Sequence, residues 1–213
     1  MDIVKDKADR QRFIKSLYLL NDAYRDDNWH RDTTNLSLFE RPAHWPERKP
    51  LVSILAYTLM PNHFHLILQE IELGGIAKFM QRLGGSMALC FNLKYKEQGS
   101  IFQGSYNSRT VGKNAYLQYL IAYVLVKNVF ELYPGGLHAA LQNFDAAWDW
   151  AICYKFSSLG LSMIEKNSPV LDNATVLDLD LVNTKKFKSE AKNMLLGHAS
   201  SKEDLKPYIL EKW

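Results

Sequence analysis

The sequence is poor in cysteine, contains no long apolar run and carries little excess charge. Its 213 residues include only 2 Cys, 11 Gly and 7 Pro, which excludes the disulfide-scaffold and collagen-like classes. A hydrophobic fraction of 47% excludes an intrinsically disordered chain and is enough to form a sizeable core. The longest apolar run, from Tyr119 to Val126, is far shorter than the ~20 residues of a membrane span, so we expect no membrane partner.

The N-terminal segment lacks the apolar stretch of a signal peptide, because MDIVKDKADRQRF alternates charged and apolar residues. The two cysteines, Cys90 and Cys153, fit a reducing compartment. We therefore expect a cytoplasmic protein.

The formal net charge of +3 hides an uneven distribution. Residues 1–72 carry 10 basic and 11 acidic side chains, residues 73–128 carry 7 and 1, and residues 129–213 carry 9 and 11. The central stretch, with a net charge of +6, is where a polyanion would bind. The alternative is a solvated face with an accidental charge bias.

Hydrophobic periodicity predicts an α+β domain. Apolar residues at three- and four-residue spacing predict helices over residues 7–24, 76–94 and 113–129. Strand-forming runs predict three strands: LVSILAYTLM at 51–60, covered on both faces, HFHLILQE at 63–70, and IFQGSYNSRTV at 101–111. The order helix, strand, strand, helix, strand, helix indicates an antiparallel sheet with helices packed on one face.

Two further segments bear on the organisation of the chain. The stretch 28–50 has three prolines and no period, so it is functional, an insertion, or contains a short helix. We expect one catalytic-type domain over residues 1–160, followed by a helical C-terminal extension, 161–213, whose sequence offers no motif.

His63 and His65 stand two residues apart on a predicted strand. Side chains at this spacing project from one face, about 7 Å apart at the backbone, so both imidazoles can reach one metal ion. A third group and water or substrate oxygens must complete the shell, which is the open arrangement of a catalytic site. The alternative is a pair of surface histidines on an exposed sheet face.

The predicted helix after residue 113 carries a second polar stripe. Tyr116, Tyr119, Tyr123 and Lys127 lie within roughly 80° of one another at 100° per residue. A tyrosine hydroxyl that faces a metal-bound phosphate could attack it and form a covalent phosphotyrosine. The alternative is that the rings pack against the sheet with their hydroxyls at the rim.

Four segments of the chain resemble one family. The run MPNHFHLIL at 60–68 resembles the HUH motif (histidine, hydrophobic residue, histidine) of single-tyrosine HUH transposases, particularly the REP-associated tyrosine transposases, which are similar to insertion-sequence transposases. IFQGSY at 101–106 is similar to the family's strand before its catalytic helix, and YVLVKN at 123–128 resembles that helix. With the aromatic stretch 148–159, the likeness covers about residues 9–159.

The resemblance implies a ferredoxin-like HUH palm, here without the usual first strand, and an enzyme that cleaves and rejoins single-stranded or hairpin DNA. His63 and His65 would bind Mg²⁺ or Mn²⁺, and Tyr123 would attack the scissile phosphate to give a 5′-phosphotyrosine intermediate. Family members include monomers and dimers, so a homodimer is possible. The residues expected to contact DNA are basic, aromatic or polar: Lys78, Arg82, Phe102, Gln103, Tyr106, Arg109, Lys113 and Lys127.

The sequence departs from the family at the third metal ligand, an amide one helical turn after the tyrosine. Lys127 occupies that position, and a lysine cation cannot ligate Mg²⁺. Asn128 carries the needed amide, but in a straight α-helix it points about 140° away from Tyr123. We expect Asn128 to be the third ligand only if the helix distorts or ends there.

Two rival functions follow. Lys127 favours a catalytically silent DNA- or RNA-binding module of the same fold. The second rival to the transposase is a metal-dependent phosphoesterase that uses water, although only one H-x-H is present.

Overall fold

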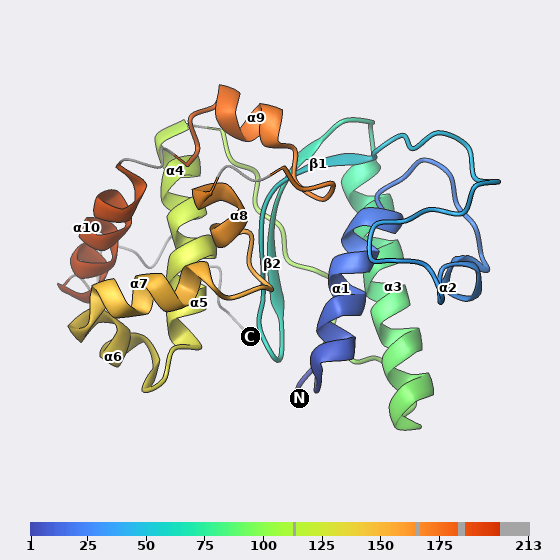
Figure 1. Cartoon of the computed structure of the whole chain (residues 1–213), viewed down its shortest axis with the longest axis horizontal. Coiled ribbons are helices and arrows are strands. Elements are labelled where there is room, and N and C mark those ends of the chain that lie inside the picture. Colours follow the sequence, from blue (N-terminus) through green and yellow to red (C-terminus); the bar gives the residue numbers. More distant parts are fainter. Residues whose placement is uncertain (113, 165–166, 183–185, 201–213) are drawn as a thin grey trace.

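The computed structural model describes residues 1–112, 114–164, 167–182 and 186–200. Within these ranges the chain forms one antiparallel β-hairpin surrounded by helices (Figure 1). The strands are β1 (Val52–Leu59) and β2 (Phe64–Glu70). The helical elements are α1 (Lys7–Leu19), α2 (Trp29–Asp32), α3 (Gly75–Tyr95), α4 (Asn114–Ala122), the π-helix η1 (Tyr123–Lys127), α5 (Asn128–Glu131), α6 (Gly136–Gln142), α7 (Phe144–Ile152), α8 (Leu159–Met163), α9 (Asn173–Asp178) and α10 (Phe187–Ser200).

The hairpin is the centre of the molecule, as LVSILAYTLM and HFHLILQE predict. β1 and β2 pair in a register that sets Leu59 opposite Phe64 and Thr58 opposite His65. Every residue of β1 is buried, whereas β2 is only partly covered. The prediction of a strand covered on both faces is therefore confirmed for β1.

Side chains from the two faces of the hairpin enter two separate hydrophobic clusters. The α3-side core joins β1 and β2 to α1 and α3, and includes Phe13, Leu17, Leu59, Phe79 and Leu83. The tyrosine-helix core joins the opposite face to η1, α5, α7 and α10, and includes Ala56, Ile67, Leu125, Phe130 and Trp148. The α+β class and the antiparallel sheet are confirmed, but helices lie on both faces of the sheet rather than on one (Figure 1).

The third predicted strand, at residues 101–111, is wrong. Ile101 is buried in the α3-side core and Val111 packs against the tyrosine-helix core, but residues 103–110 between them are exposed and have no regular structure. A strand needs a side-chain face to bury, and this polar segment around Gly104 offers none. It crosses instead from one side of the hairpin to the other, and β2 has no further strand beside it among the described residues.

The first predicted helix ends five residues early, at Leu19 instead of residue 24. Short polar side chains after it bind backbone groups of the following loop, which competes with helix formation. The Asp22 carboxylate accepts the Lys49 backbone N–H at 3.0 Å and pairs with Arg41 at 2.5 Å. The long stretch 28–50 does contain a short helix, α2.

Three features complete the fold. Residues before α1 form no strand in the described chain, as expected, and the Ile3 N–H donates to the Pro61 carbonyl at 2.8 Å. In the C-terminal extension, Phe187, Ala191 and Leu195 of α10 pack into the tyrosine-helix core. No helix among the described residues is long and apolar enough to cross a membrane.

Asn21 joins α1 to the start of β1 from a buried position. Its side-chain oxygen accepts the backbone N–H groups of Leu51 at 2.9 Å and Val52 at 3.0 Å, and its amide nitrogen donates to the Val52 carbonyl at 2.8 Å. An apolar side chain here would leave three buried backbone groups without partners.

We expect Asn21→Leu to lower the free energy of unfolding by about 3 kcal/mol, because each orphaned buried group costs about 1–3 kcal/mol. Urea denaturation measures the change. Asn35→Leu, in the exposed part of the loop, serves as the control and should change stability by less than about 0.5 kcal/mol. Equal effects of the two substitutions would contradict the role given to Asn21.

Candidate functional site

The two histidines lie together at the closed end of the hairpin. Their rings meet edge to face, with centroids 4.9 Å apart and an interplanar angle of 88°. His63 Nδ1 is 2.7 Å from the Asn62 side-chain oxygen, which can only accept, so Nδ1 carries the proton. In this tautomer the lone pair of His63 is on Nε2, the form of imidazole that binds a metal.

Tyr123 reaches the same place from the helix on that side of the hairpin. Its ring lies edge to face against His65, with centroids 6.2 Å apart and an interplanar angle of 89°. The side chain is only 3% exposed. The structure therefore brings together His63, His65 and Tyr123, which come from two elements far apart in sequence.

Lys127 lies beside the Tyr123 hydroxyl and not on the surface. Its Nζ donates to Tyr123 Oη at 3.3 Å, lies 4.8 Å from the centre of the ring, and pairs with Glu131 Oε1 at 2.7 Å. The residue is 6% exposed. A buried ammonium needs such a partner, because leaving it unpaired is strongly unfavourable.

The tyrosine helix is distorted just before Asn128, which is the distortion that would bring the Asn128 side chain toward Tyr123. Tyr123–Lys127 form a π-helix, in which the Asn128 backbone N–H donates to the Tyr123 carbonyl, five residues back. In a π turn residue i+5 lies over residue i, whereas in an α-helix residue i+4 does. Lys127 and Asn128 thus both come near the direction of Tyr123.

The Asn128 side chain is fully buried, and neither its amide oxygen nor its amide nitrogen has a hydrogen-bond partner among the described residues. Such a group is rare, because a buried unpaired amide is unfavourable by about 1–3 kcal/mol. A bound ligand that contacts the Asn128 side-chain amide would offset this unfavourable burial.

The tyrosine stripe continues up the helix as a row of rings. Tyr116 stacks on Tyr119 with centroids 6.2 Å apart, and Tyr119 tilts against Tyr123 at 6.5 Å. Burial raises the pKa of Tyr119, and the neighbouring Tyr116 adds to this shift. Both rings pack against the tyrosine-helix core, and Tyr119 stays protonated at neutral pH.

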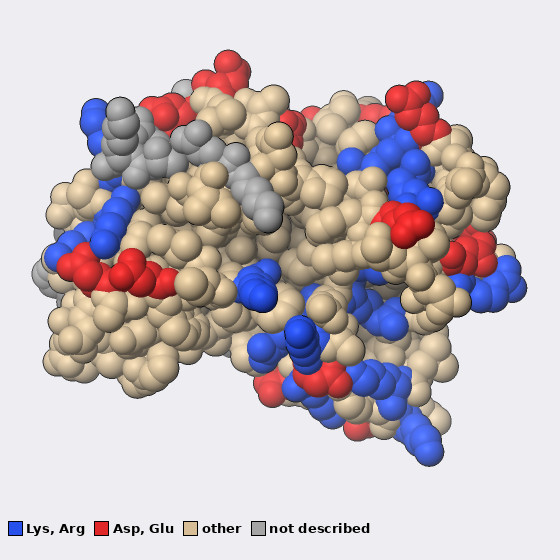
Figure 2. Space-filling view, viewed as in Figure 1, with Lys and Arg blue, Asp and Glu red and all other residues tan. Residues whose placement is uncertain are grey.

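The residues expected to contact DNA do not form one surface. Lys78 and Arg82 belong to α3, whose buried face lies in the α3-side core, across the hairpin from Tyr123. Arg82 donates to the backbone carbonyl of Asp22 at 2.5 Å, so it supports the loop. Basic side chains gather where α1 begins and α3 ends, mixed with acidic ones (Figure 2).

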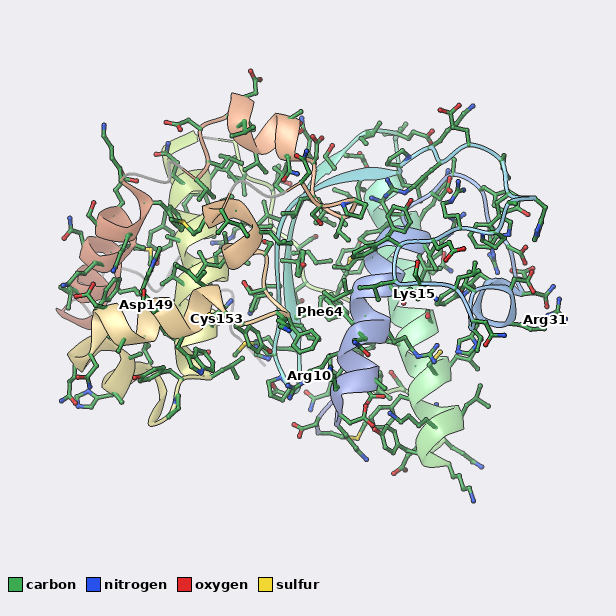
Figure 3. All side chains as sticks on the ribbon, in the orientation of Figure 1. Arg10, Lys15, Arg31, Phe64, Asp149 and Cys153 are labelled. Carbon is green, nitrogen blue, oxygen red and sulfur yellow. The ribbon has the colours of Figure 1, made fainter. Side chains whose placement is uncertain are left out.

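The crossing segment after α3 holds the other candidates. Phe102 is half-buried against Phe64, with ring centroids 6.1 Å apart. Figure 3 shows Phe64 between the hairpin and α1, and its ring also meets that of Phe13 at 5.2 Å. Gln103, Tyr106 and Arg109 are exposed, and Lys113 lies outside the described residues.

A second group of ligand-type side chains was not predicted. Single oxygen or nitrogen atoms of Asp26, Asp32 and His44 lie within 4.8 Å of one another in the loop around α2. Asp26 already accepts the Asn28 backbone N–H at 2.7 Å and Asp32 pairs with Arg31 at 3.0 Å. No sequence pattern predicts this group, because its members are irregularly spaced along a loop.

Comparison with known proteins supports a transposase. Residues 27–126 match the family described as IS200-like transposases, a range that includes both histidines and Tyr123 and ends just before Lys127. No curated protein and no solved structure matches the chain. The family catalyses DNA transposition, which requires binding and cleaving DNA and typically a divalent metal ion. Residues 27–126 are therefore similar to IS200-like transposases, which confirms the resemblance found in MPNHFHLIL.

Proposed function

We propose that the protein cleaves and rejoins single-stranded DNA with Tyr123 as the nucleophile and a divalent cation held by His63, His65 and Asn128. The observation that carries the proposal is the contact between the Tyr123 and His65 rings, 6.2 Å apart. This contact supports the proposal because it brings the Tyr123 ring against one of the two histidines, and tyrosine-mediated phosphoryl transfer needs the phenol close to the metal ligands.

The donor set fits Mg²⁺ or Mn²⁺. Two imidazole nitrogens and the Asn128 amide oxygen are three neutral ligands, and phosphate oxygens and water would fill the remaining positions. The buried, unpartnered Asn128 amide supports this assignment. A bound divalent ion would polarise the scissile phosphate as a Lewis acid.

Tyr123 performs the transfer in two balanced steps. In cleavage, a bond forms between Tyr123 Oη and phosphorus while the bond from phosphorus to the 3′-oxygen breaks, and the phenol proton ends overall on the released 3′-hydroxyl. In rejoining, a bond forms between a 3′-oxygen and phosphorus while the bond from phosphorus to Tyr123 Oη breaks, and the proton of the 3′-hydroxyl ends overall on Oη. Because each step exchanges one phosphoester for another, no external energy source is required.

Lys127 supports both steps from its place beside Oη. Its ammonium donates to that oxygen at 3.3 Å and offsets the negative charge that the phenolate carries as it attacks or leaves. Glu131 holds the ammonium in position. This gives Lys127 a role that does not require it to ligate the cation.

A second candidate function, the catalytically silent DNA- or RNA-binding module, is favoured by a different observation. Tyr123 is 3% exposed and Lys127 is 6% exposed, so a phosphate reaches them only if a neighbouring segment moves. Adduct formation separates the two functions directly.

In this proposal the exposed crossing segment, residues 103–110, guides the strand. It lies between the two cores and carries Gln103, Tyr106 and Arg109. An aromatic ring stacks on an unpaired base and a guanidinium contacts phosphate, without requiring a particular sequence.

The nucleophile is tested by trapping the intermediate. We expect labelled single-stranded DNA hairpins incubated with the protein and Mn²⁺ to give a protein–DNA adduct that survives denaturing electrophoresis. Tyr123→Phe should reduce the adduct by more than about a thousandfold, because the attacking oxygen is gone. Tyr119→Phe, the neighbouring ring of the same row, should retain it.

Two other outcomes of this experiment would favour the rival functions. Cleavage without an adduct would favour the water-using phosphoesterase, and binding without cleavage would favour the silent module. An undiminished adduct in Tyr123→Phe would disprove the assignment of the nucleophile.

The third ligand is tested through stability. We expect Asn128→Leu to leave the metal-free protein as stable as the parent, or up to about 2 kcal/mol more stable, because it removes an unpaired buried amide. Thermal denaturation in a chelator measures this, with Asn21→Leu as the buried asparagine whose loss destabilises. Added Mn²⁺ should raise the melting temperature of the parent but not of Asn128→Leu. If Asn128→Leu destabilises as much as Asn21→Leu, the amide has a structural role.

The strand path is tested by affinity. We expect Tyr106→Ala to weaken binding of a single-stranded oligonucleotide about tenfold, since one base stack contributes about 1–3 kcal/mol. Lys78→Ala, which lies on the far side of the hairpin, should change affinity less than about twofold. Fluorescence anisotropy at one fixed salt concentration compares them, and the reverse order of effects would place the strand on α3.

A further inference from the structure

The π turn that carries Tyr123 is bonded to β1 by one buried hydroxyl. Thr58 Oγ1 lies 2.8 Å from the carbonyl oxygen of Val124, and Thr58 is 0% exposed. A carbonyl only accepts, so Thr58 donates its single proton to Val124. Within a π turn the regular bonding to the residue four positions on is interrupted, and a side chain from outside the helix can take part in the backbone bonding there.

The Thr58 hydroxyl is itself the acceptor at the end of a chain of hydrogen bonds. Ser157 Oγ lies 3.0 Å from Thr58 Oγ1, and because the Thr58 proton is already committed, Ser157 is the donor. Ser157 Oγ in turn accepts the Leu159 backbone N–H at 3.3 Å. Three buried donors thus act in series and end on the π turn, so the polar groups strengthen one another.

Thr58 also lies beside the proposed metal site. It is the cross-strand partner of His65, and paired residues in an antiparallel sheet project from the same face. One residue therefore neighbours His65 through the sheet and bonds the residue after Tyr123 through its hydroxyl. Thr58 therefore links the hairpin that carries the histidines to the tyrosine helix.

We propose that Thr58 is a positioning residue: its hydroxyl holds the π turn, and the π turn brings the Asn128 amide to the side of the helix that faces His63 and His65. The inference rests on the proposed function for the identity of the ligands. Without the hydroxyl, Val124 loses its buried partner and the turn gains freedom to return to α-helical bonding, which carries Asn128 away from the site.

The experiment compares Thr58→Val with two controls in the full chain. Thr58→Ser keeps the hydroxyl. Ser158→Ala removes a buried hydroxyl that accepts the Tyr57 backbone N–H at 3.1 Å, so it perturbs the same strand without touching η1. Mn²⁺ binding is measured by paramagnetic water relaxation, and amide hydrogen exchange is measured across residues 123–128.

We expect Thr58→Val to bind Mn²⁺ about tenfold more weakly than the parent, as loss of a group that orients a ligand does. Hydrogen exchange at the Asn128 backbone N–H should be about tenfold faster than in the parent. Thr58→Ser and Ser158→Ala should resemble the parent in both Mn²⁺ affinity and exchange rate. In the Asn128→Ala background, Thr58→Val should weaken Mn²⁺ binding no further, because the two residues act through one ligand. Unchanged affinity and exchange in Thr58→Val, or fully additive losses in the double variant, would overturn the proposal.

Failure of the proposed function gives a different result. If the parent binds no Mn²⁺, or if His63→Ala and His65→Ala leave binding intact, the assigned ligands are wrong, whereas the exchange measurement still decides whether Thr58 holds the turn. If Thr58→Val does not fold, Ser157→Ala replaces it, because it removes the hydroxyl that donates to Thr58. Exchange in Ser157→Ala no faster than in Ser158→Ala would then contradict the inference.

Discussion

Burial of β1 on both of its faces is the constraint from which the rest of the architecture follows. All eight of its residues are buried, so each face needs its own cover, and two separate cores result. Polar residues on such a strand must find partners inside the protein. Thr58 finds its partner in η1, with a hydrogen bond of 2.8 Å to Val124. The strand that fills the core therefore also sets the distance between the histidine hairpin and the tyrosine helix.

Much of the fold could be predicted because its elements carry clear apolar patterns. The helix α3 follows from the apolar stripe along one of its faces, and the strand β1 follows from its nearly continuous apolar run. The segment 101–111 failed because strand-forming residues at its ends, such as Ile101 and Val111, enter different cores, and pattern alone does not show which core a residue joins. The early end of α1 depends on loop contacts of Asp22 that no local rule contains.

Part of the site could be predicted because regular strand geometry decides it. His63 and His65 share a face because strand geometry requires it, and the family match includes Tyr123. Asn128 is different, because its position relative to Tyr123 depends on whether the helix bonds to the fourth or the fifth residue. That choice is supported by the hydrogen bond from Thr58 to Val124, two residues 66 positions apart along the chain. A helical wheel drawn from the sequence assumes regular bonding and therefore turns Asn128 toward the core.

The folded structure changes what the basic central segment means. Lys94 pairs with Asp6 and Asp9 at 2.6 Å each, and its hydrogen bond holds the pKa of the Asp6 carboxyl below the usual value. Lys127 pairs with Glu131, and Arg82 binds backbone carbonyls. Charges already paired within the protein release few counterions from DNA, so in the proposed function binding by this segment would depend less on salt than a net charge of +6 would give. On the proposed strand path, stacking on the exposed Tyr106 ring, which salt screens little, would then carry a larger share of the affinity.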